Sequence, residues 1–293
     1  MIRRLTLLLL LLLTIVAVPA RSDPRTLVIT DELQLGLAAT FMAEGEYYRA
    51  VTEYKKFLYF FPDSDKADFA RLQIGLALYH GGECTRAIES FARVRQSYPS
   101  EYFTTAALYE GVCRQRLKNP GAAMDDFERV VAADPAAPEA AEALAGLSLA
   151  ALDREDFDGS RQALQRLVTD YSDLPKGVAA KEALPLVDAA DSSPRKSPVA
   201  AGAMSAFLPG SGYAYAGRPR DVLTAFLVNG LFIAGTVVAI EDENYPAAVL
   251  LGGVGIPFYL GNIYGSADAA RKWNLGIAQD LRKELALRLE YHF

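Results

Sequence analysis

Few residues of this chain could do metal or covalent chemistry. There are two cysteines, Cys84 and Cys113, and two histidines, His80 and His292. Neither histidine is spaced to complete a metal-ligand set with the cysteines, so we predict no metal site and no cofactor. A Ser-His-Asp or Cys-His arrangement also needs a histidine beside its nucleophile, and His80 is the single histidine before the extreme C-terminus.

Acidic pairs and a Gly-rich stretch are the remaining candidates for chemistry. Asp125 with Asp126, and Glu139 with Glu142, have spacings typical of a solvent-exposed helix face. The Gly-rich stretch around Gly210 lacks the Lys-Ser/Thr ending of a phosphate loop, and no predicted strand precedes it. We therefore predict that the protein is not an enzyme and takes no small-molecule substrate.

An internal repeat supplies the elements that position these residues. The stretch Gly45–Pro62, GEYYRAVTEYKKFLYFFP, returns three more times in looser form. A small residue marks the middle of each copy at intervals of 37, 36 and 37 residues: Ala50, Ala87, Ala123 and Ser160. This period predicts a helical hairpin repeat. Two other positions recur, an aromatic residue or Leu four residues on (Tyr54, Phe91, Phe127, Leu164) and Pro or Ser twelve on (Pro62, Pro99, Pro135, Ser172).

These positions resemble the tetratricopeptide repeat, and the second copy matches best, through Gly75, Gly82, Ala87, Phe91 and Pro99. The third copy departs at Glu110, where Leu is usual. Small residues let antiparallel helices approach closely, and stacked hairpins bury faces that one hairpin cannot. The fold class is therefore all-α, with a superhelix of about four repeats plus a capping helix over residues 24–190. We expect first helices near 30–43, 66–80, 102–117 and 137–152, and second helices near 46–60, 84–97, 120–133 and 156–171.

The expected helices bring the two cysteines together. Cys84 opens the second helix of the second repeat, and Cys113 lies near the end of the next helix, which packs antiparallel to it. In an exported protein this arrangement favours a disulfide. The alternative is two buried thiols that act as small hydrophobic residues.

Aromatic residues gather in the first repeat. Most suit its core, but Tyr48, Tyr59 and Phe60 exceed what the repeat pattern requires. Exposed aromatic side chains often anchor protein interfaces, so these three are candidate partner-binding residues. The alternative places them in the repeat core as well.

The first twenty residues have the pattern of a Sec signal peptide. Arg3 and Arg4 precede an apolar run that ends at Val18-Pro19-Ala20, a small-residue cleavage pattern. An uncleaved signal anchor is the alternative, and either would export the chain. Without Arg3 and Arg4 the chain has 28 basic and 36 acidic residues, which argues against a nucleic-acid partner.

Beyond a Pro- and Ser-rich linker at 191–198, the composition becomes that of a membrane domain, which we place at 199–267. Val222–Ile240 and Tyr245–Tyr264 are charge-free over 19 and 20 residues, each long enough to cross about 30 Å of hydrocarbon as a helix. An acidic loop, Glu241–Asn244, joins them. A hydrophobic pair buried in a soluble domain is the alternative.

The segment ahead of this hairpin resembles a family of small bacterial two-helix membrane domains with a Pro-Gly-x-Gly-x-x-Tyr-x-Gly motif. Here Pro209, Gly210, Gly212, Tyr215 and Gly217 carry it, and Tyr213 stands where Gln is common. The resemblance implies an architecture and no activity.

Charge bears on how this domain crosses the membrane. With exported repeats and two crossings, Arg218, Arg220, Arg271 and Lys272 stay outside, which inverts the usual rule for an inner membrane. A third crossing or a deep re-entrant helix over 198–217 would restore the rule by placing the arginines inside and the acidic loop outside, and we favour that topology in an inner membrane.

The tail, residues 268–293, carries two periodicities. Leu275, Ala278, Leu281, Leu285 and Leu289 fit an amphipathic helix, with Arg282, Lys283 and Arg288 available to lipid headgroups. Alternation from Leu285 to Phe293 instead fits a β-strand of an outer-membrane barrel. We favour the helix.

Together these features predict a membrane-anchored scaffold of the bacterial cell envelope. Its periplasmic repeats would bind an envelope protein or peptide, and its partners would include membrane lipid. Exported arrays of this kind resemble those that organise outer-membrane assembly, cell-wall synthesis or secretion. The alternative makes the membrane domain an oligomeric pore or insertion factor that the repeats recruit.

Overall fold

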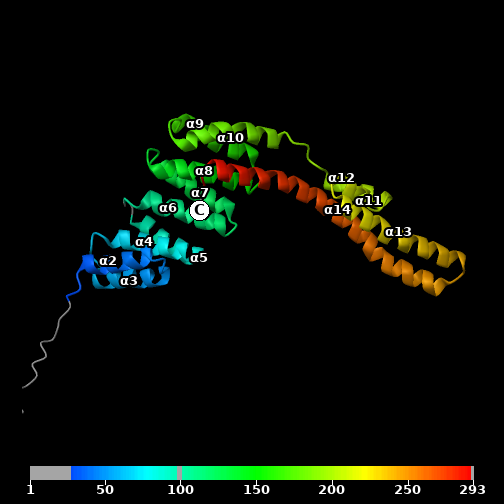
Figure 1. Ribbon diagram of the computed structural model, residues 1–293, viewed down its shortest axis with the longest axis horizontal. Coiled ribbons are helices and arrows are strands. Elements are labelled where there is room, and N and C mark those ends of the chain that lie inside the picture. The colour runs from blue at the N-terminus through cyan, green and yellow to red at the C-terminus, as the bar shows by residue number, and fades with distance from the viewer. Residues whose placement is uncertain (1–27, 98–100, 292–293) are drawn as a thin grey trace, which may run out of the picture.

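The chain folds into paired helices that stack in sequence order and lead into a long apolar hairpin (Figure 1). The structure is a computed structural model that describes residues 28–97 and 101–291, and the predicted signal peptide lies outside these ranges. Within them there are thirteen helices and no strand. The β-strand alternative for the tail is therefore wrong over its described residues.

Eight helices form the four predicted hairpins, and their bounds agree with the sequence-based ranges to within two residues. The hairpins are α2 (Asp31–Ala43) with α3 (Tyr47–Phe60), α4 (Ala67–His80) with α5 (Cys84–Gln96), α6 (Phe103–Arg116) with α7 (Pro120–Ala133), and α8 (Pro138–Leu152) with α9 (Phe157–Asp170). Helix α10 (Pro175–Asp191) packs on α9 and closes the stack.

Close helix contacts occur where the repeat pattern places its small and aromatic residues. A Cβ at Gly75 would lie 2.3 Å from the Phe91 ring, and one at Gly111 would lie 2.6 Å from the Phe127 ring. Both rings are fully buried. Any larger side chain at either glycine would push the two helices apart, which explains why small residues recur there.

The departure at Glu110 forms a buried ion network between the second and third repeats. The Glu110 carboxylate has no exposed area and accepts 2.6 Å hydrogen bonds from Arg95 and Arg114. Asp126 is also fully buried, 2.7 Å from Arg114 and 2.5 Å from Arg129. The prediction of a solvent-exposed Asp125–Asp126 pair is therefore wrong for Asp126, because Arg114 on the preceding helix α6 and Arg129 on α7 itself pair with its buried carboxylate.

The C-terminal third adds four helices: α11 (Pro198–Phe207), α12 (Ser211–Tyr215), α13 (Pro219–Glu241) and α14 (Tyr245–Arg288). Helices α13 and α14 form the apolar hairpin, and α11 and α12 pack beside its base on α14. Helix α14 has 44 residues and runs from the tip of the hairpin back to the repeats, where it ends against α8 and α10. The predicted membrane domain and tail thus share one continuous helix.

Candidate functional site

The last turns of α14 lie on the face of the stack that α6, α8 and α10 form. We call this the inner face and residues 277–291 the tail segment. Of the five apolar positions predicted for one side of the tail helix, Ala278, Leu281, Leu285 and Leu289 are buried in the repeat core, whereas Leu275 is exposed and lies outside it. The amphipathic periodicity is therefore confirmed, but the apolar stripe packs on protein.

Polar contacts hold the tail segment in place. Arg282 Nε lies 2.7 Å from Asp153 Oδ1, and Lys176 Nζ donates a 2.6 Å hydrogen bond to the carbonyl oxygen of Leu289. Arg288 pairs with Glu284 at 2.9 Å and lies 3.8 Å from Glu182. The prediction that Arg282 is available to lipid headgroups is wrong, because Asp153 of the repeats pairs with it. Lys283 and Arg288 are exposed beside acidic residues of α14, and their contact with lipid stays a prediction.

Tyr291 extends the tail segment towards α6. Its hydroxyl donates a 3.3 Å hydrogen bond to Gln115 Oε1, and its pKa is raised well above the ordinary value by burial. Beside it lies a cavity of about 280 Å³ whose lining includes Gln115, Arg116 and Arg282. Beyond this cavity the inner face of the first two repeats has no part of the tail segment on it (Figure 1).

That open part of the inner face carries an aromatic cluster which sequence reasoning missed. The Tyr47 and His80 rings stack at 5.5 Å, and Tyr79 meets Tyr109 edge-on at 5.2 Å. Arg116 lies over the Tyr79 ring and donates a 2.8 Å hydrogen bond to its hydroxyl. Burial raises the pKa of Tyr79 to about 12, while burial and the charge of Arg116 lower the pKa of His80. These residues come from different repeats, so no single copy of the pattern reveals the cluster.

The three predicted partner-binding residues lie on α3 and are exposed. Tyr59 and Phe60 form an edge-on pair with ring centroids 5.5 Å apart at the end of the helix. Tyr48 is eleven residues earlier on the same helix face, about 16 Å away, and its hydroxyl donates a 3.2 Å hydrogen bond to Glu83. The structure therefore groups Tyr59 with Phe60 and separates Tyr48. None of the three belongs to the buried core, and partner binding remains a prediction.

Cys84 and Cys113 are both buried free thiols, and the Cys113 thiol contacts Cys84. Burial, together with a hydrogen bond to Cys84, raises the pKa of Cys113. The predicted proximity is present. The disulfide itself stays a prediction.

The Pro-Gly-x-Gly segment packs against α11, α13 and α14 through its glycines. Gly210 has a left-handed φ of 90°, and its N–H donates to buried Asn262 at 3.1 Å. A Cβ at Gly212 would lie 2.0 Å from the Ala201 carbonyl oxygen, and the Gly212 N–H donates to Ser205 at 3.0 Å. These contacts fold α12 back on α11, and each requires the absence of a side chain.

The remaining motif residues, Pro209, Tyr215 and Gly217, complete the turn. The Tyr215 hydroxyl accepts a 2.9 Å hydrogen bond from the Ser197 N–H, and Gly217 lies against the Trp273 ring with φ of 77°. Pro209 precedes the left-handed Gly210. The motif therefore has a structural role, in line with a resemblance that implied architecture alone.

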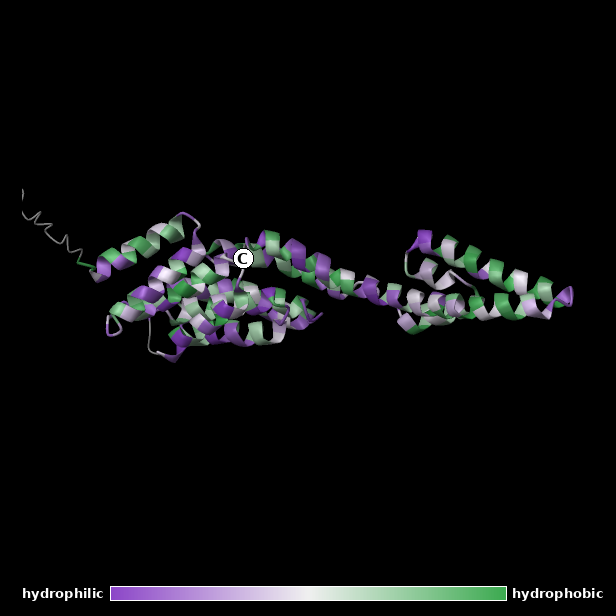
Figure 2. Ribbon diagram, turned by 90° about the horizontal axis from the view of Figure 1, so that it is seen from below, coloured by the Kyte–Doolittle hydropathy of each residue, from purple (hydrophilic) through white to green (hydrophobic). Residues whose placement is uncertain are grey.

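The apolar hairpin has the length and composition of two candidate membrane spans. The most apolar windows of α13 and α14 are 17% and 11% buried, so most of their apolar side chains face outward. Figure 2 shows the two helices of the hairpin mainly in green and white, with hydrophilic residues in purple at the tip. The alternative of a hydrophobic pair buried in a soluble domain does not fit this exposure.

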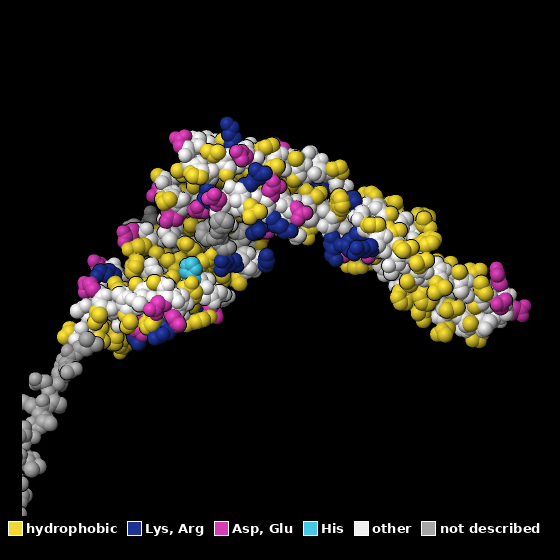
Figure 3. Space-filling view, in the orientation of Figure 1, with side chains coloured by type: hydrophobic (Ala, Val, Ile, Leu, Met, Phe, Trp, Pro, Cys, Tyr) yellow, Lys and Arg dark blue, Asp and Glu magenta, His cyan; other side chains and the backbone are white. Residues whose placement is uncertain are grey.

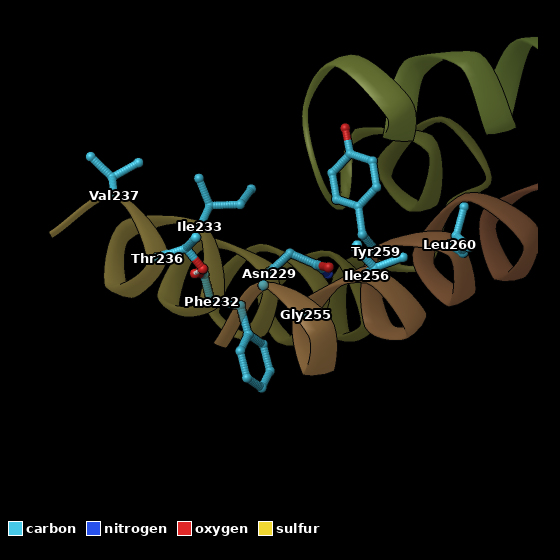
Figure 4. A pocket seen from close by; sticks show the side chains of 10 residues that line it. Asn229, Phe232, Ile233, Thr236, Val237, Gly255, Ile256, Tyr259 and Leu260 are labelled. Carbon is cyan, nitrogen blue, oxygen red and sulfur yellow. Dashed lines mark hydrogen bonds between the residues drawn. The ribbon is translucent and has the colours of Figure 1, made fainter. Parts of the chain in front are cut away.

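A groove of about 300 Å³ lies between the two helices of the hairpin (Figure 4). Its lining is apolar apart from Asn229, Thr236 and Tyr259. The Tyr259 hydroxyl donates to the Ala206 carbonyl of α11, while the Asn229 side chain is 3% exposed and donates to its own helix at Ala225. The hairpin is thus tied to α11.

Comparison with protein-family models identifies the repeats in the stack of helical hairpins. Residues 72–138 and 114–175 match the tetratricopeptide repeat model. Residues 72–175 therefore carry tetratricopeptide repeats. The match spans the second, third and fourth hairpins, while the first tetratricopeptide-like hairpin and the membrane-domain motif lie outside it.

Three solved structures are similar in part. A MamA RS-1 ArsTM double mutant has 21% identity and a TM-score of 0.46, covering 56% of this chain and 85% of that one. MamA 41-end from Desulfovibrio magneticus RS-1 has 22% identity and a TM-score of 0.44, covering 54% and 84%. PilW, described as a widely conserved type IV pilus biogenesis factor, has 18% identity and a TM-score of 0.42, covering 79% and 96%. Comparison with curated proteins finds no match.

Proposed function

We propose that the protein is a membrane-anchored scaffold of the bacterial cell envelope whose tetratricopeptide repeats bind an envelope protein. One observation carries the proposal. Helix α14 forms half of the exposed apolar hairpin and ends with Leu285 and Leu289 buried in the repeat core. A hairpin that lies in a membrane would therefore hold the repeats at a fixed distance from its surface.

The exposure of the hairpin supports insertion into lipid. Leu231 and Val249, on opposite helices, are among its most exposed residues, and the charge-free lengths match the hydrocarbon thickness. The outward-facing side chains are mostly apolar, which supports an anchor. The alternative of a pore would need a polar lining along the whole crossing. The polar residues between the two helices include Asp221, Thr224 and Asn262, and these lie in the half of the hairpin next to α12, while the other half is mostly apolar.

The tail segment bears on where a partner binds. Because it covers the inner face formed by α8 and α10, we assign partner binding to the open inner face of the first two repeats. Within the aromatic cluster His80 is exposed and Tyr47 half-buried on this face, while Tyr79 supports them from the core, and the Tyr59–Phe60 pair lies at the N-terminal end of the stack. Aromatic rings beside a cationic Arg116 are typical anchors of protein interfaces.

The shape of the hairpin also bears on topology. Helix α11 has ten residues, about 15 Å of length, so it is too short for a third crossing and leaves the re-entrant alternative. The start of α13 and the end of the apolar part of α14 then lie on the side of the membrane that faces the repeats. The acidic loop Glu241–Asn244 lies on the opposite side. A re-entrant helix returns to the side from which it entered, so, against our expectation, it does not restore the charge rule. The inner membrane therefore stays a prediction that the charge rule no longer supports. With export as predicted, the repeats are periplasmic.

Partner binding is tested by photo-cross-linking in the native cells. A benzophenone amino acid at Tyr47, Tyr59 or His80 of the full chain should give an adduct of defined mass. Lys181, exposed on the capping helix, is the matched control position and should give none. Absence of a defined adduct at all three test positions would contradict the scaffold.

Anchoring and topology are tested separately by protease access. Cleavage sites placed after Asp191 and between Asp242 and Glu243 should be cut from opposite sides of sealed vesicles. The full chain should also resist extraction by alkaline carbonate, while a chain that stops after Asp191 should not. Cutting of both sites from one side would contradict the two-crossing hairpin.

A further inference from the structure

Four exposed basic residues surround the base of the apolar hairpin, and we call them the collar. Arg218 precedes α13, Arg220 lies in its first turn, and Arg271 and Lys272 follow the apolar part of α14. They flank the charge-free stretches on the side that faces the repeats. Figure 3 shows a basic group at this neck and acidic residues at the far tip of the hairpin.

The collar residues lie at one level because the motif turn packs on α14. A Cβ at Gly217 would lie 3.2 Å from the Trp273 ring, so the residue before Arg218 contacts the residue after Lys272. Three of the four collar residues lie close enough to Asp268 to affect its carboxylate: Lys272, Arg271 and Arg218 all lower its pKa. Lys196 adds a further cation at the same level, 3.4 Å above the Trp273 ring.

The collar has more positively charged side chains than the neighbouring acidic side chains can neutralise. Asp221 lies 3.5 Å from Arg218, and Asp268 lies 2.7 Å from Lys272. Arg220 and Arg271 have no such ion pair among the described residues. At the opposite end, Glu241, Asp242 and Glu243 form a purely acidic tip. The two ends of the hairpin therefore differ in sign.

Aromatic side chains mark the same level. Trp273 and Tyr264 are exposed near the collar, and Tyr245 is exposed near the acidic tip. Trp and Tyr prefer the boundary between hydrocarbon and headgroups. Between these two levels lie 19 or 20 charge-free residues, about 30 Å of helix. A hairpin inserted to this depth places the collar among the headgroups of one leaflet.

We propose that the collar binds the phosphate groups of anionic phospholipids in the leaflet that faces the repeats. Guanidinium and ammonium groups at headgroup depth attract anionic lipid, and the excess of positive charge supplies the preference over zwitterionic lipid. The proposal rests on the membrane insertion proposed above. It adds the lipid class and assigns it to the collar in place of the tail basic residues.

The test uses the full chain inserted into vesicles of phosphatidylcholine alone or of an equal mixture with phosphatidylglycerol. After mild detergent extraction, the lipids that remain bound are identified by native mass spectrometry. The wild-type chain should retain phosphatidylglycerol in excess over its share of the mixture. The variant R218Q/R220Q/R271Q/K272Q should lose at least about fivefold of that excess, the expected effect of a single basic residue near a membrane surface.

Two further variants separate charge from folding. R218K/R220K/R271K keeps the charge and should keep the excess. Replacement of exposed basic residues on the repeats and tail, K55Q/R86Q/K181Q/K283Q, should leave it unchanged. If the collar variant R218Q/R220Q/R271Q/K272Q retains the same excess of phosphatidylglycerol as the wild type, lipid binding by the collar is overturned, while the proposed anchoring stands. Removal of the excess from the wild type by inorganic phosphate would have the same meaning. A wild-type chain that enters neither vesicle would overturn the proposed anchoring as well.

Discussion

Lys176 Nζ lies 2.6 Å from the main-chain oxygen of Leu289, so the first turn of the capping helix binds the end of the helix that begins at the hairpin tip. Lys176 also pairs with Glu142 of α8 at 3.1 Å. One lysine thus joins the fourth repeat, the capping helix and α14. The carbonyl groups at a helix C-terminus have no partner within the helix, and a cation there is favourable. The contact makes the stability of the repeats depend on the membrane-domain helix.

Replacement of Leu285 by Ala should therefore destabilise the repeats. Leu285 is fully buried in the repeat core although it belongs to α14. Loss of a buried leucine costs about 2–5 kcal/mol of unfolding free energy. Urea unfolding of the full chain in detergent, followed by circular dichroism, measures the change. Leu287→Ala, at a site 74% exposed on the same turn, is the control and should change stability by about 0.5 kcal/mol or less. Equal effects of the two changes would contradict the packing of the tail segment on the repeats.

Gly212→Ala should disrupt the motif turn. Its Cβ would overlap the Ala201 carbonyl oxygen, which is main chain of α11 and cannot move aside alone. We expect a loss of about 2 kcal/mol or more, the range for overpacking. Trypsin cleavage near Arg218 and Arg220 should become faster in detergent as α12 separates from α14. Gly230→Ala, with nothing within 4 Å of its Cβ, is the control and should cleave at the wild-type rate.

The repeat period sufficed to predict the helical hairpins, because it records contacts between neighbours in the chain. Gly75 against Phe91 is such a contact, and sequence analysis located both. Two features could not be predicted in this way. Burial of Asp126 depends on Arg114 from the preceding helix, and burial of Leu285 depends on a face assembled more than a hundred residues earlier. The apolar stripe of the tail helix predicted a buried face correctly, but periodicity cannot distinguish lipid from protein as its partner.

The two cysteines should form a disulfide when the repeats fold in an oxidising compartment. Each thiol would lose a proton and one electron to a cellular oxidant as the sulfur–sulfur bond forms. In the reduced protein, burial raises the pKa of Cys113, so alkylation at neutral pH should be slow until the chain is denatured. Protein from the native envelope, denatured without reductant, should therefore resist iodoacetamide and give a linked peptide pair by mass spectrometry. Alkylation of both cysteines under those conditions would contradict the disulfide. Cys84→Ala is the control, and its Cys113 should be alkylated after denaturation with or without reductant.

Asp126 should make the stability of the repeats fall as pH rises. Burial, with help from the Glu110 carboxylate, raises the pKa of Asp126 to about 6, against the lowering effects of Arg114 and Arg129. Since the unfolded value is near 3.8, the folded protein binds the proton more tightly between about pH 4 and pH 6. Stability contributed by the protonated form is therefore lost across that window.

The change Asp126→Asn removes this titration while keeping the size of the side chain. A shift of two pKa units corresponds to roughly 3 kcal/mol, so the variant should gain up to that amount relative to wild type between pH 4 and pH 7, whatever its constant offset. Urea unfolding at a series of pH values measures the difference. The neighbouring exposed Asp125→Asn should follow the wild-type curve. A difference between Asp126→Asn and wild type that does not change with pH would show that the arginines around Asp126 keep it ionised throughout.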